Sequence, residues 1–131
     1  MVLVDTSVLI NFFKGSSGKP IQKLKNILHN KIPFGVTPII MQELLQGARD
    51  EKEFKILQEY LETQNFFHPL NSINSFIESA RIYFLCRKKG LTIRSSTDCL
   101  IAQIAIENDL FILHDDQDFV NISKVVNLKL Y

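Results

Sequence analysis

Several features are scarce in this 131-residue chain, and each absence excludes a class of protein. There are only two cysteines, Cys86 and Cys99, without metal-ligand spacing, and a domain of this length does not need a disulfide. We therefore expect two reduced core thiols in a cytoplasmic protein. No apolar run reaches the roughly 18 residues that span a bilayer, so no membrane helix is expected. The N-terminal segment reaches Asp5 too early for a secretory signal.

Repeats, low-complexity tracts and long linkers are also missing, so one domain is expected over residues 1–131. A hydrophobic content of 46% provides a sizeable core and excludes disorder as the main state. A large excess of positive charge is absent as well, since 15 basic and 14 acidic residues give a net charge of +1. If five acids gathered in one metal site, the remaining nine would leave the rest of the surface at +6, which attracts a polyanion. Those five acids are Asp5, Glu43, Asp98, Asp116 and Asp118.

Short apolar runs alternate with amphipathic segments along the chain. Strands are predicted at residues 2–4, 34–36, 66–67, 110–113 and 125–126. Helices are predicted at residues 8–13 with Thr6 and Ser7 as caps, 20–29, 38–46 after a Thr37 cap, 50–62, 73–89, 97–108 with a Thr97 cap, and 118–122. Continuous apolar runs, as opposed to in-and-out alternation, indicate a parallel sheet that is covered on both faces. The predicted fold class is therefore α/β, a three-layer α/β/α domain with a mostly parallel central sheet.

Acidic residues fall where such a sheet would gather them. Asp5 and Asp116 follow the two most apolar strands, and open α/β sheets bind ligands outside the carboxyl ends of their strands. Asp5 by itself is explained equally well as a helix cap. Glu43 lies on the helix face of Ile39 and Ile40, where a carboxylate is costly unless it is paired or ligating. A glutamate at the edge of the stripe, with its carboxylate in water, remains an alternative.

The third and fourth acidic segments lie near the end of the chain. Asp98 shares its helix face with Ile101 and Ala102, which directs it toward the sheet, while Asp115, Asp116 and Asp118 crowd a strand end. Four distant segments thus each offer a carboxylate to one sheet edge. Hard divalent cations prefer oxygen ligands, and carboxylates this close repel one another unless a cation or protons intervene. The chemistry that fits is metal-assisted hydrolysis of a phosphodiester.

These segments resemble, in order and spacing, the four motifs of PIN-domain nucleases, and in particular those of VapC-type toxins from toxin–antitoxin pairs. The resemblance covers residues 2 to about 120 and is carried by Val4–Ile10, Thr37–Gly47, Thr97–Ala102 and Leu113–Phe119. It implies an endoribonuclease dependent on Mg²⁺ or Mn²⁺ that cleaves RNA with metal-activated water. It also implies a homodimer and inhibition by a cognate antitoxin protein.

The resemblance assigns the site residue by residue. The catalytic acids would be Asp5, Glu43, Asp98 and Asp116, the metal ligands Asp5, Asp98 and Asp116, and the auxiliary residues Asp118, Thr6 and Ser7. Two positions depart from the family pattern. Asn11 stands where many relatives carry an acid, and Asp115 adds an acid beside Asp116.

Other interpretations remain open. A domain that only binds RNA or a partner protein, and a metal-dependent phosphatase, are the alternative functions, although the phosphatase pattern needs an acid where Ser7 stands. His114 is either a general base or a surface residue. The apolar stripes of helices 50–62 and 73–89 are interpreted first as core, and helix 50–62 alternatively as one wall of an antitoxin groove. Candidate phosphate contacts are Lys14, Lys19, Arg49 and Arg94.

Overall fold

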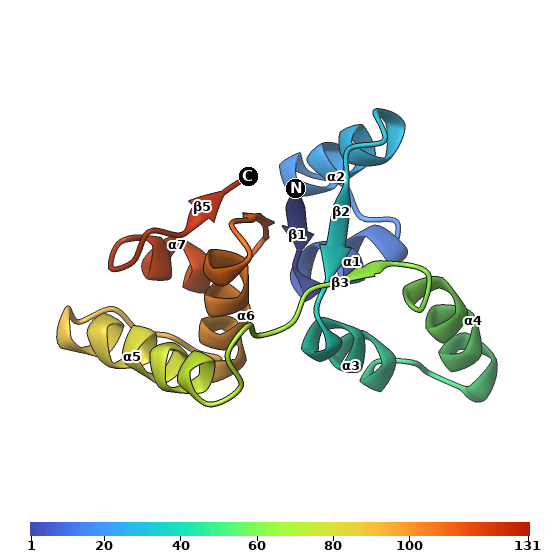
Figure 1. The fold of residues 1–131 in the computed structure, drawn as a ribbon. Coiled ribbons are helices and arrows are strands. Elements are labelled where there is room, and N and C mark those ends of the chain that lie inside the picture. Colours follow the sequence, from blue (N-terminus) through green and yellow to red (C-terminus); the bar gives the residue numbers. More distant parts are fainter.

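Five short parallel strands lie between two groups of helices (Figure 1). The structure is a computed structural model that describes all residues 1–131. The strands are β1 (Val2–Val4), β2 (Phe34–Val36), β3 (Asn65–Phe66), β4 (Phe111–Leu113) and β5 (Lys129–Leu130). The helices are α1 (Thr6–Phe13), α2 (Lys19–His29), α3 (Pro38–Gln46), α4 (Glu51–Leu61), α5 (Asn74–Lys88), α6 (Ser96–Glu107) and α7 (Gln117–Ser123).

The strand order β3-β2-β1-β4-β5 explains why the helices divide into two groups. Every neighbouring pair is parallel, so each connection must cross one face of the sheet. Right-handed connections from β1 to β2 and β3 place α1–α4 on one face, and the return to β4 and β5 places α5–α7 on the other. Figure 1 shows these two groups on opposite sides of the strands. The predicted three-layer α/β/α class is confirmed, with a sheet that is parallel throughout.

The central strands form the middle of the core because helices cover both of their faces. All three residues of β1 are buried, with Leu3 paired in register to Gly35 of β2 and Ile112 of β4. The predicted burial of the run 110–113 is correct except at Phe111, which is exposed. Phe111 is the first residue of β4, and its ring packs edge-on against that of Tyr131.

Most predicted helix beginnings differ from the structure by one or two residues, and for two helices the predicted cap is wrong. Helix α1 begins at Thr6 and not at Val8, because Asp5 is its N-cap and accepts the backbone N–H of Ser7 at 3.0 Å. Helix α6 begins at Ser96 after an N-cap at Ser95, so Thr97 lies in its first turn. In both cases the chain turns into the helix directly at the sheet edge.

The final strand is also misplaced by the sequence pattern. Val125 and Val126 follow α7 in a turn, and β5 is formed by Lys129–Leu130. A parallel β5 must start at the same edge as β4, so the chain first has to return along the sheet after α7. The apolar pair lies on that return path and packs against the core.

Helix α5 has its apolar stripe on the outside. Its buried residues are Ser75, Ser79, Ile82 and Cys86. Ser75 donates a hydrogen bond from its hydroxyl to Glu107 of α6 at 2.6 Å, so small polar residues let the two helices approach. The large apolar residues of the predicted stripe are exposed, so interpreting them as core is wrong: they are Ile73, Phe76, Ile77, Tyr83 and Phe84.

Two expectations from the scarce features can be compared with the fold. No helix in the structure combines the length and the apolar character needed to cross a membrane. Cys86 and Cys99 are both buried and unpaired, as predicted for core thiols. Burial raises the pKa of the Cys99 thiol to about 12, which keeps it protonated and unreactive.

Gly35 allows β3 to approach β2, and this generates a test of the sheet. A Cβ at this position would lie 2.5 Å from the carbonyl oxygen of Asn65 and 2.6 Å from the ring of Phe67. We expect Gly35→Ala to lower the free energy of unfolding by about 1–3 kcal/mol, because backbone would have to move. Urea unfolding followed by circular dichroism measures this. Gly47→Ala is the control and should be nearly neutral, since its Cβ would lie 3.5 Å from Leu44 in ordinary contact.

Candidate active site

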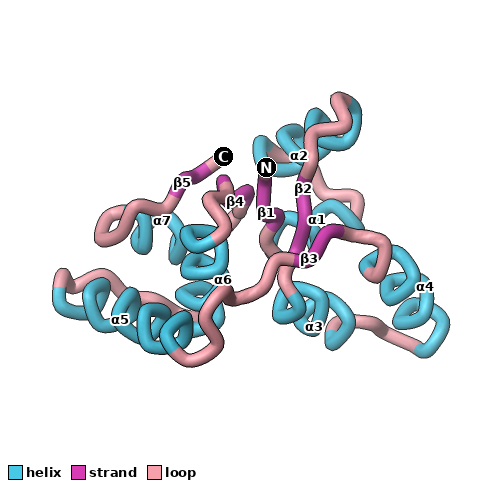
Figure 2. The backbone as a smooth tube through the Cα atoms, in the orientation of Figure 1, coloured by secondary structure: helices cyan, strands magenta, loops and turns pink.

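The candidate site lies where the chain reverses its direction of winding, between β1 and β4. The chain leaves this pair toward β2 on one side and toward β5 on the other, and in open α/β sheets ligands bind at such a switch point, outside the carboxyl ends of the strands. The backbone N–H of Asp5 donates to the carbonyl of Leu113 at 2.9 Å and holds the two strand ends together. Figure 2 shows β4 beside β1, with loops leaving both. Residues from the first and last thirds of the chain therefore meet here.

Three carboxylates form the tightest group near these strand ends. Asp98 in the first turn of α6, Asp116 at the N-cap of α7 and Asp118 in its first turn each offer an oxygen within 4.8 Å of the others. We call these three residues the acidic cluster. It contains two of the metal ligands suggested by the sequence, Asp98 and Asp116, together with Asp118, which was suggested only as an auxiliary.

Asp5 interacts with the acidic cluster through its charge, and it is also the N-cap of α1. It is 4% exposed, and its Oδ2 accepts bonds from the backbone N–H and the hydroxyl of Ser7, at 3.0 and 2.6 Å. Burial raises the pKa of Asp5, the bonds from Ser7 oppose that shift, and the charge of Asp116 adds to it. The two explanations weighed for Asp5, helix cap and site acid, are therefore both consistent with its position.

Glu43 reaches the same region from α3. It is half-buried, and its Oε1 is enclosed without a hydrogen-bond partner. Burial and the charge of Asp5 raise its pKa. An enclosed carboxylate oxygen with no donor is costly, so this position calls for a proton or a cation.

Asp98 is the most perturbed acid of the site. It is 7% exposed and its Oδ2 has no hydrogen-bond partner. Burial, followed by the charges of Asp5, Asp116 and Asp118, raises its pKa to about 8. The prediction that Asp98 shares its face with Ile101 and Ala102 and points inward is confirmed. A carboxylate in such surroundings is stabilised by a positive ion or remains protonated.

These residues fit a hard divalent cation. The donor set consists of oxygen atoms alone, which suits Mg²⁺ or Mn²⁺ better than a metal that prefers sulfur or imidazole. Two enclosed oxygens, Asp98 Oδ2 and Glu43 Oε1, lack any partner within the protein. The partial exposure of Asp116 leaves a route to solvent for the water molecules that Mg²⁺ retains.

Ser7 and Thr6 differ in what they contact. The Ser7 hydroxyl donates to Asp5 and accepts the backbone N–H of Asp115 at 3.0 Å, so it joins α1 to the segment after β4. The Thr6 hydroxyl is buried without a partner. Ser7 therefore orients Asp5, whereas the Thr6 side chain lies beside Glu43 and partly opposes the rise in the pKa of that carboxyl group.

The two departures from the family pattern contact each other. The side-chain amide of Asn11 donates to the exposed carboxylate of Asp115 at 3.3 Å. An acid at position 11 would place two negative charges together, whereas asparagine supplies a donor. The extra acid and the missing acid therefore compensate one another at the rim of the site.

His114 is held in place by the backbone. Its Nδ1 accepts the backbone N–H of Asp116 at 3.2 Å, and its ring lies 5.3 Å from that of Phe119. Burial lowers its pKa, so the neutral form with the proton on Nε2 fits this bond. His114 is half-buried at the end of β4, so it keeps partial contact with solvent.

Arg94 contacts the acidic cluster, whereas the sequence indicated it only as one of four candidate phosphate contacts. Its guanidinium donates to Asp116 Oδ1 at 2.9 Å, and its Nε lies 3.6 Å from Asp118 Oδ1. The other oxygen of Asp118 accepts the backbone N–H groups of Arg94 and Ser95, at 2.8 and 3.1 Å. The available signal was the position of Arg94 four residues before Asp98; its pairing with α7 has no counterpart in the sequence.

The chain matches the family model described as the PIN domain over residues 2–125. It is also 30% identical over 130 residues to the ribonuclease VapC11 of Mycobacterium tuberculosis, a comparison that covers 98% of this chain and 96% of the relative.

Two solved structures illustrate the shared fold. VapBC2 from Rickettsia felis, bound to a DNA fragment of the promoter, matches with a TM-score of 0.75 at 17% identity over 100% of this chain and 98% of that chain. VapBC-1 from nontypeable Haemophilus influenzae matches with a TM-score of 0.74 at 19% identity over 100% and 97%. At these identities the likeness supports the fold.

The raised pKa of Asp98 predicts how the metal-free protein responds to pH. Between about pH 4 and 8 the folded protein holds a proton on Asp98 that the unfolded chain has released, so this contribution to stability is lost as the pH rises. Asp98→Asn should therefore raise the melting temperature in chelator at pH 8 by roughly 4 °C or more, with little effect near pH 4. Scanning calorimetry across this range measures it. Equal melting curves for both proteins at pH 8 would contradict the electrostatic description.

Proposed function

The chain belongs to the PIN domain family, and from this premise we propose that it is a metal-dependent endoribonuclease, the toxin of a toxin–antitoxin pair. The observation that carries the proposal is the acidic cluster near the carboxyl ends of β1 and β4, together with the enclosed and unpartnered oxygens of Asp98 and Glu43. In a domain that only binds RNA, this concentration of negative charge would repel the RNA and give no benefit. The identity to a ribonuclease along nearly the whole chain supports RNA as the substrate.

We assign the cation to the acidic cluster, with Asp5 and Glu43 beside it. Asp98, Asp116 and Asp118 would hold Mg²⁺ or Mn²⁺, and Asp5 would complete the negative surroundings through its charge. When bound, the ion supplies a water of lowered pKa and a positive charge opposite the phosphate oxygens. Glu43, with a raised pKa and a free Oε1, is the group suited to exchange a proton near the reacting phosphate.

His114 does not suit the competing reaction, in which a histidine activates the 2′-hydroxyl of RNA. Its Nδ1 already accepts a backbone N–H, which leaves the proton on Nε2 and no free base. The chain's own residues therefore favour water as the nucleophile. The products expected from that route carry 5′-phosphate and 3′-hydroxyl ends.

An apolar groove between α1, α3 and α4 is our proposed antitoxin site. A cavity of about 660 Å³ lies there, lined on its apolar side by Ile10, Phe13, Leu44 and Leu57. Phe13 is 41% exposed, and its ring packs edge-on against Tyr60 of α4. One wall of such a groove is the alternative interpretation of helix 50–62 from the sequence. The apolar lining suits the apolar face of an amphipathic helix from a partner protein.

The outward apolar stripe of α5 is our proposed homodimer surface. Its large side chains are between 38% and 72% exposed, which is unusual for a single helix face of a monomer. A second copy of the chain would cover this stripe in a symmetric contact. We also propose a cytoplasmic location, which the two buried and unpaired thiols support.

The proposed activity predicts a specific loss in an isosteric variant. Asp5→Asn should reduce cleavage of RNA in Mn²⁺ by about 10²-fold or more, because a site charge is removed. The fold should survive, since an amide oxygen can still accept from Ser7. Gel analysis of cleaved RNA, with mapping of the product ends, measures both the rate and the chemistry.

Matched variants make this assay specific. Glu59→Gln removes one exposed carboxylate from α4 and should cleave like the wild type. His114→Ala should leave the 5′-phosphate ends unchanged. Cyclic 2′,3′-phosphate ends that persist in chelator would overturn the proposed mechanism, and RNA binding without any cleavage in Mg²⁺ or Mn²⁺ would point to the binding-only function.

The dimer proposal predicts an effect of charge on α5. Ile77→Glu should convert a dimer of 15.1 kDa chains into monomers at micromolar concentration, because it places a carboxylate in the covered stripe. Ile56→Glu is the control, since Ile56 is similarly exposed but lies on α4. Multi-angle light scattering distinguishes the two masses. A wild-type monomer at this concentration would refute the proposed dimer.

A further inference from the structure

Arg94 occupies a position from which it contacts the candidate site with two different groups. It lies in the loop between α5 and α6, and its backbone N–H is bonded to Asp118, which is 2% exposed. This bond anchors the loop regardless of the side chain. The guanidinium then reaches Asp116 and the second oxygen of Asp118.

The guanidinium is the one basic group in the structure that pairs with the acidic cluster. Its contact with Asp116 ends on Oδ1, which also accepts the backbone N–H of Asp118 at 2.9 Å. Since Asp116 belongs to the cluster suited to a divalent cation, Arg94 and the cation would share one carboxylate. Two positive groups on one carboxylate repel each other, so binding of the ion weakens the contact with Arg94.

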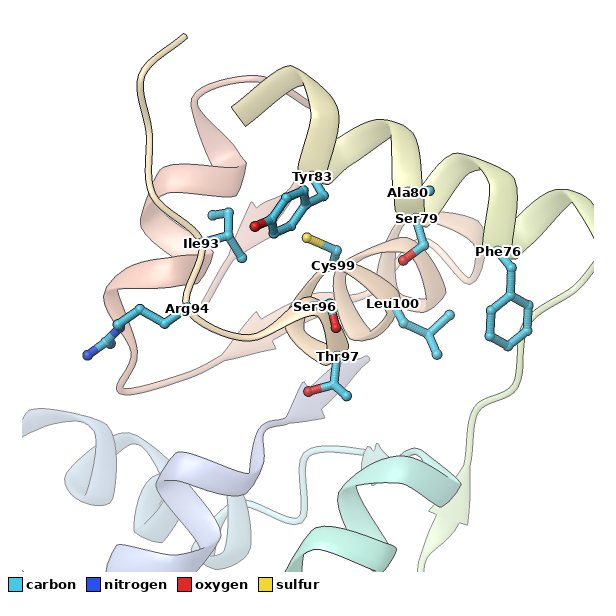
Figure 3. Close-up of a pocket in the computed structure, with 10 residues that line it drawn as sticks. All are labelled: Phe76, Ser79, Ala80, Tyr83, Ile93, Arg94, Ser96, Thr97, Cys99 and Leu100. Atoms are coloured by element: carbon cyan, nitrogen blue, oxygen red, sulfur yellow. The ribbon is translucent and has the colours of Figure 1, made fainter. Parts of the chain in front are cut away.

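The Arg94 side chain is free to leave that contact. It is 70% exposed, and an ion pair at such exposure is weak. Arg94 lies at the edge of a pocket that Tyr83 and Cys99 also line, and Figure 3 shows its side chain extending away from both of them. A planar guanidinium released beside the site presents paired N–H donors that match a phosphate.

We infer that Arg94 is the counter-cation of the acidic cluster in the metal-free protein, and that the divalent ion releases it to bind a phosphate of the RNA strand. The second half rests on the proposed function, whereas the first half depends only on the metal site. Arg94 is thus a positioning residue that exchanges partners between Asp116 and the substrate.

Calorimetric titration with Mn²⁺, without RNA, tests the first half. Arg94→Gln should bind Mn²⁺ about two- to fivefold more tightly than the wild type, since a competing exposed charge is removed. Arg94→Lys keeps the charge and should stay near the wild type. Arg81→Gln is the control, because Arg81 is similarly exposed and pairs only with Glu78 on α5. Unchanged Mn²⁺ affinity in Arg94→Gln, or equal tightening in Arg94→Lys, overturns the inference.

RNA binding tests the second half in the Asp5→Asn background, where cleavage is expected to be lost. With Mn²⁺ present, adding Arg94→Gln should weaken binding of a fluorescent single-stranded RNA and reduce the slope of log affinity against log salt by about one. An unchanged slope refutes the phosphate contact. Melting curves verify folding first, and Arg94→Met replaces Arg94→Gln if the latter does not fold.

The two proposals can fail separately. If the wild-type protein cleaves no RNA, the proposed function fails, while the Mn²⁺ titrations still report whether Arg94 competes with the ion. If cleavage occurs and Arg94→Gln leaves Mn²⁺ affinity unchanged, the proposed function stands and the role of Arg94 is refuted.

Discussion

Repulsion between buried carboxylates at the end of β1 and β4 is the interaction on which the rest of the structure depends. Asp5, Asp98 and Asp118 are each less than 9% exposed, and the pKa of Asp98 is raised to about 8. A fold tolerates such a site only where other contacts hold its parts in place. The all-parallel sheet supplies them, because its central strands are buried on both faces and are joined by backbone bonds up to the acid itself.

The same carboxylates that create the repulsion also position the local structure. Asp5 caps α1, Asp116 caps α7, and Asp118 fixes the loop before α6 through two backbone N–H groups. Each bond lowers the cost of keeping the charge, and each places the beginning of a helix at the site. These bonds use one oxygen of each residue, while Asp98 Oδ2 in the same site is enclosed and has no partner.

The apolar residues of α5 are divided between the core and an outward face. The buried side of α5 uses serines to pack closely on α6, while its aromatic side faces outward. Period alone identifies such a stripe but not its direction, because a helix has the same 3.6-residue repeat on a core face and on a partner face. The interpretation of this stripe as core failed for that reason, whereas the inward direction of Asp98 beside Ile101 and Ala102 was correct.

The sequence by itself determined the α/β class and the helices and strands to within a few residues. It also identified the acids that follow β1 and β4. These features depend on local periodicity and on where strands end, which residues close together in the chain determine. Only the tertiary structure decided which oxygens face one another. It brought Asp118 to Asp98, Arg94 to Asp116 and Asn11 to Asp115, pairs that lie 20, 22 and 104 positions apart and meet only in the folded chain. Electrostatic contacts of this kind depend on distance in space, which spacing along the chain does not encode.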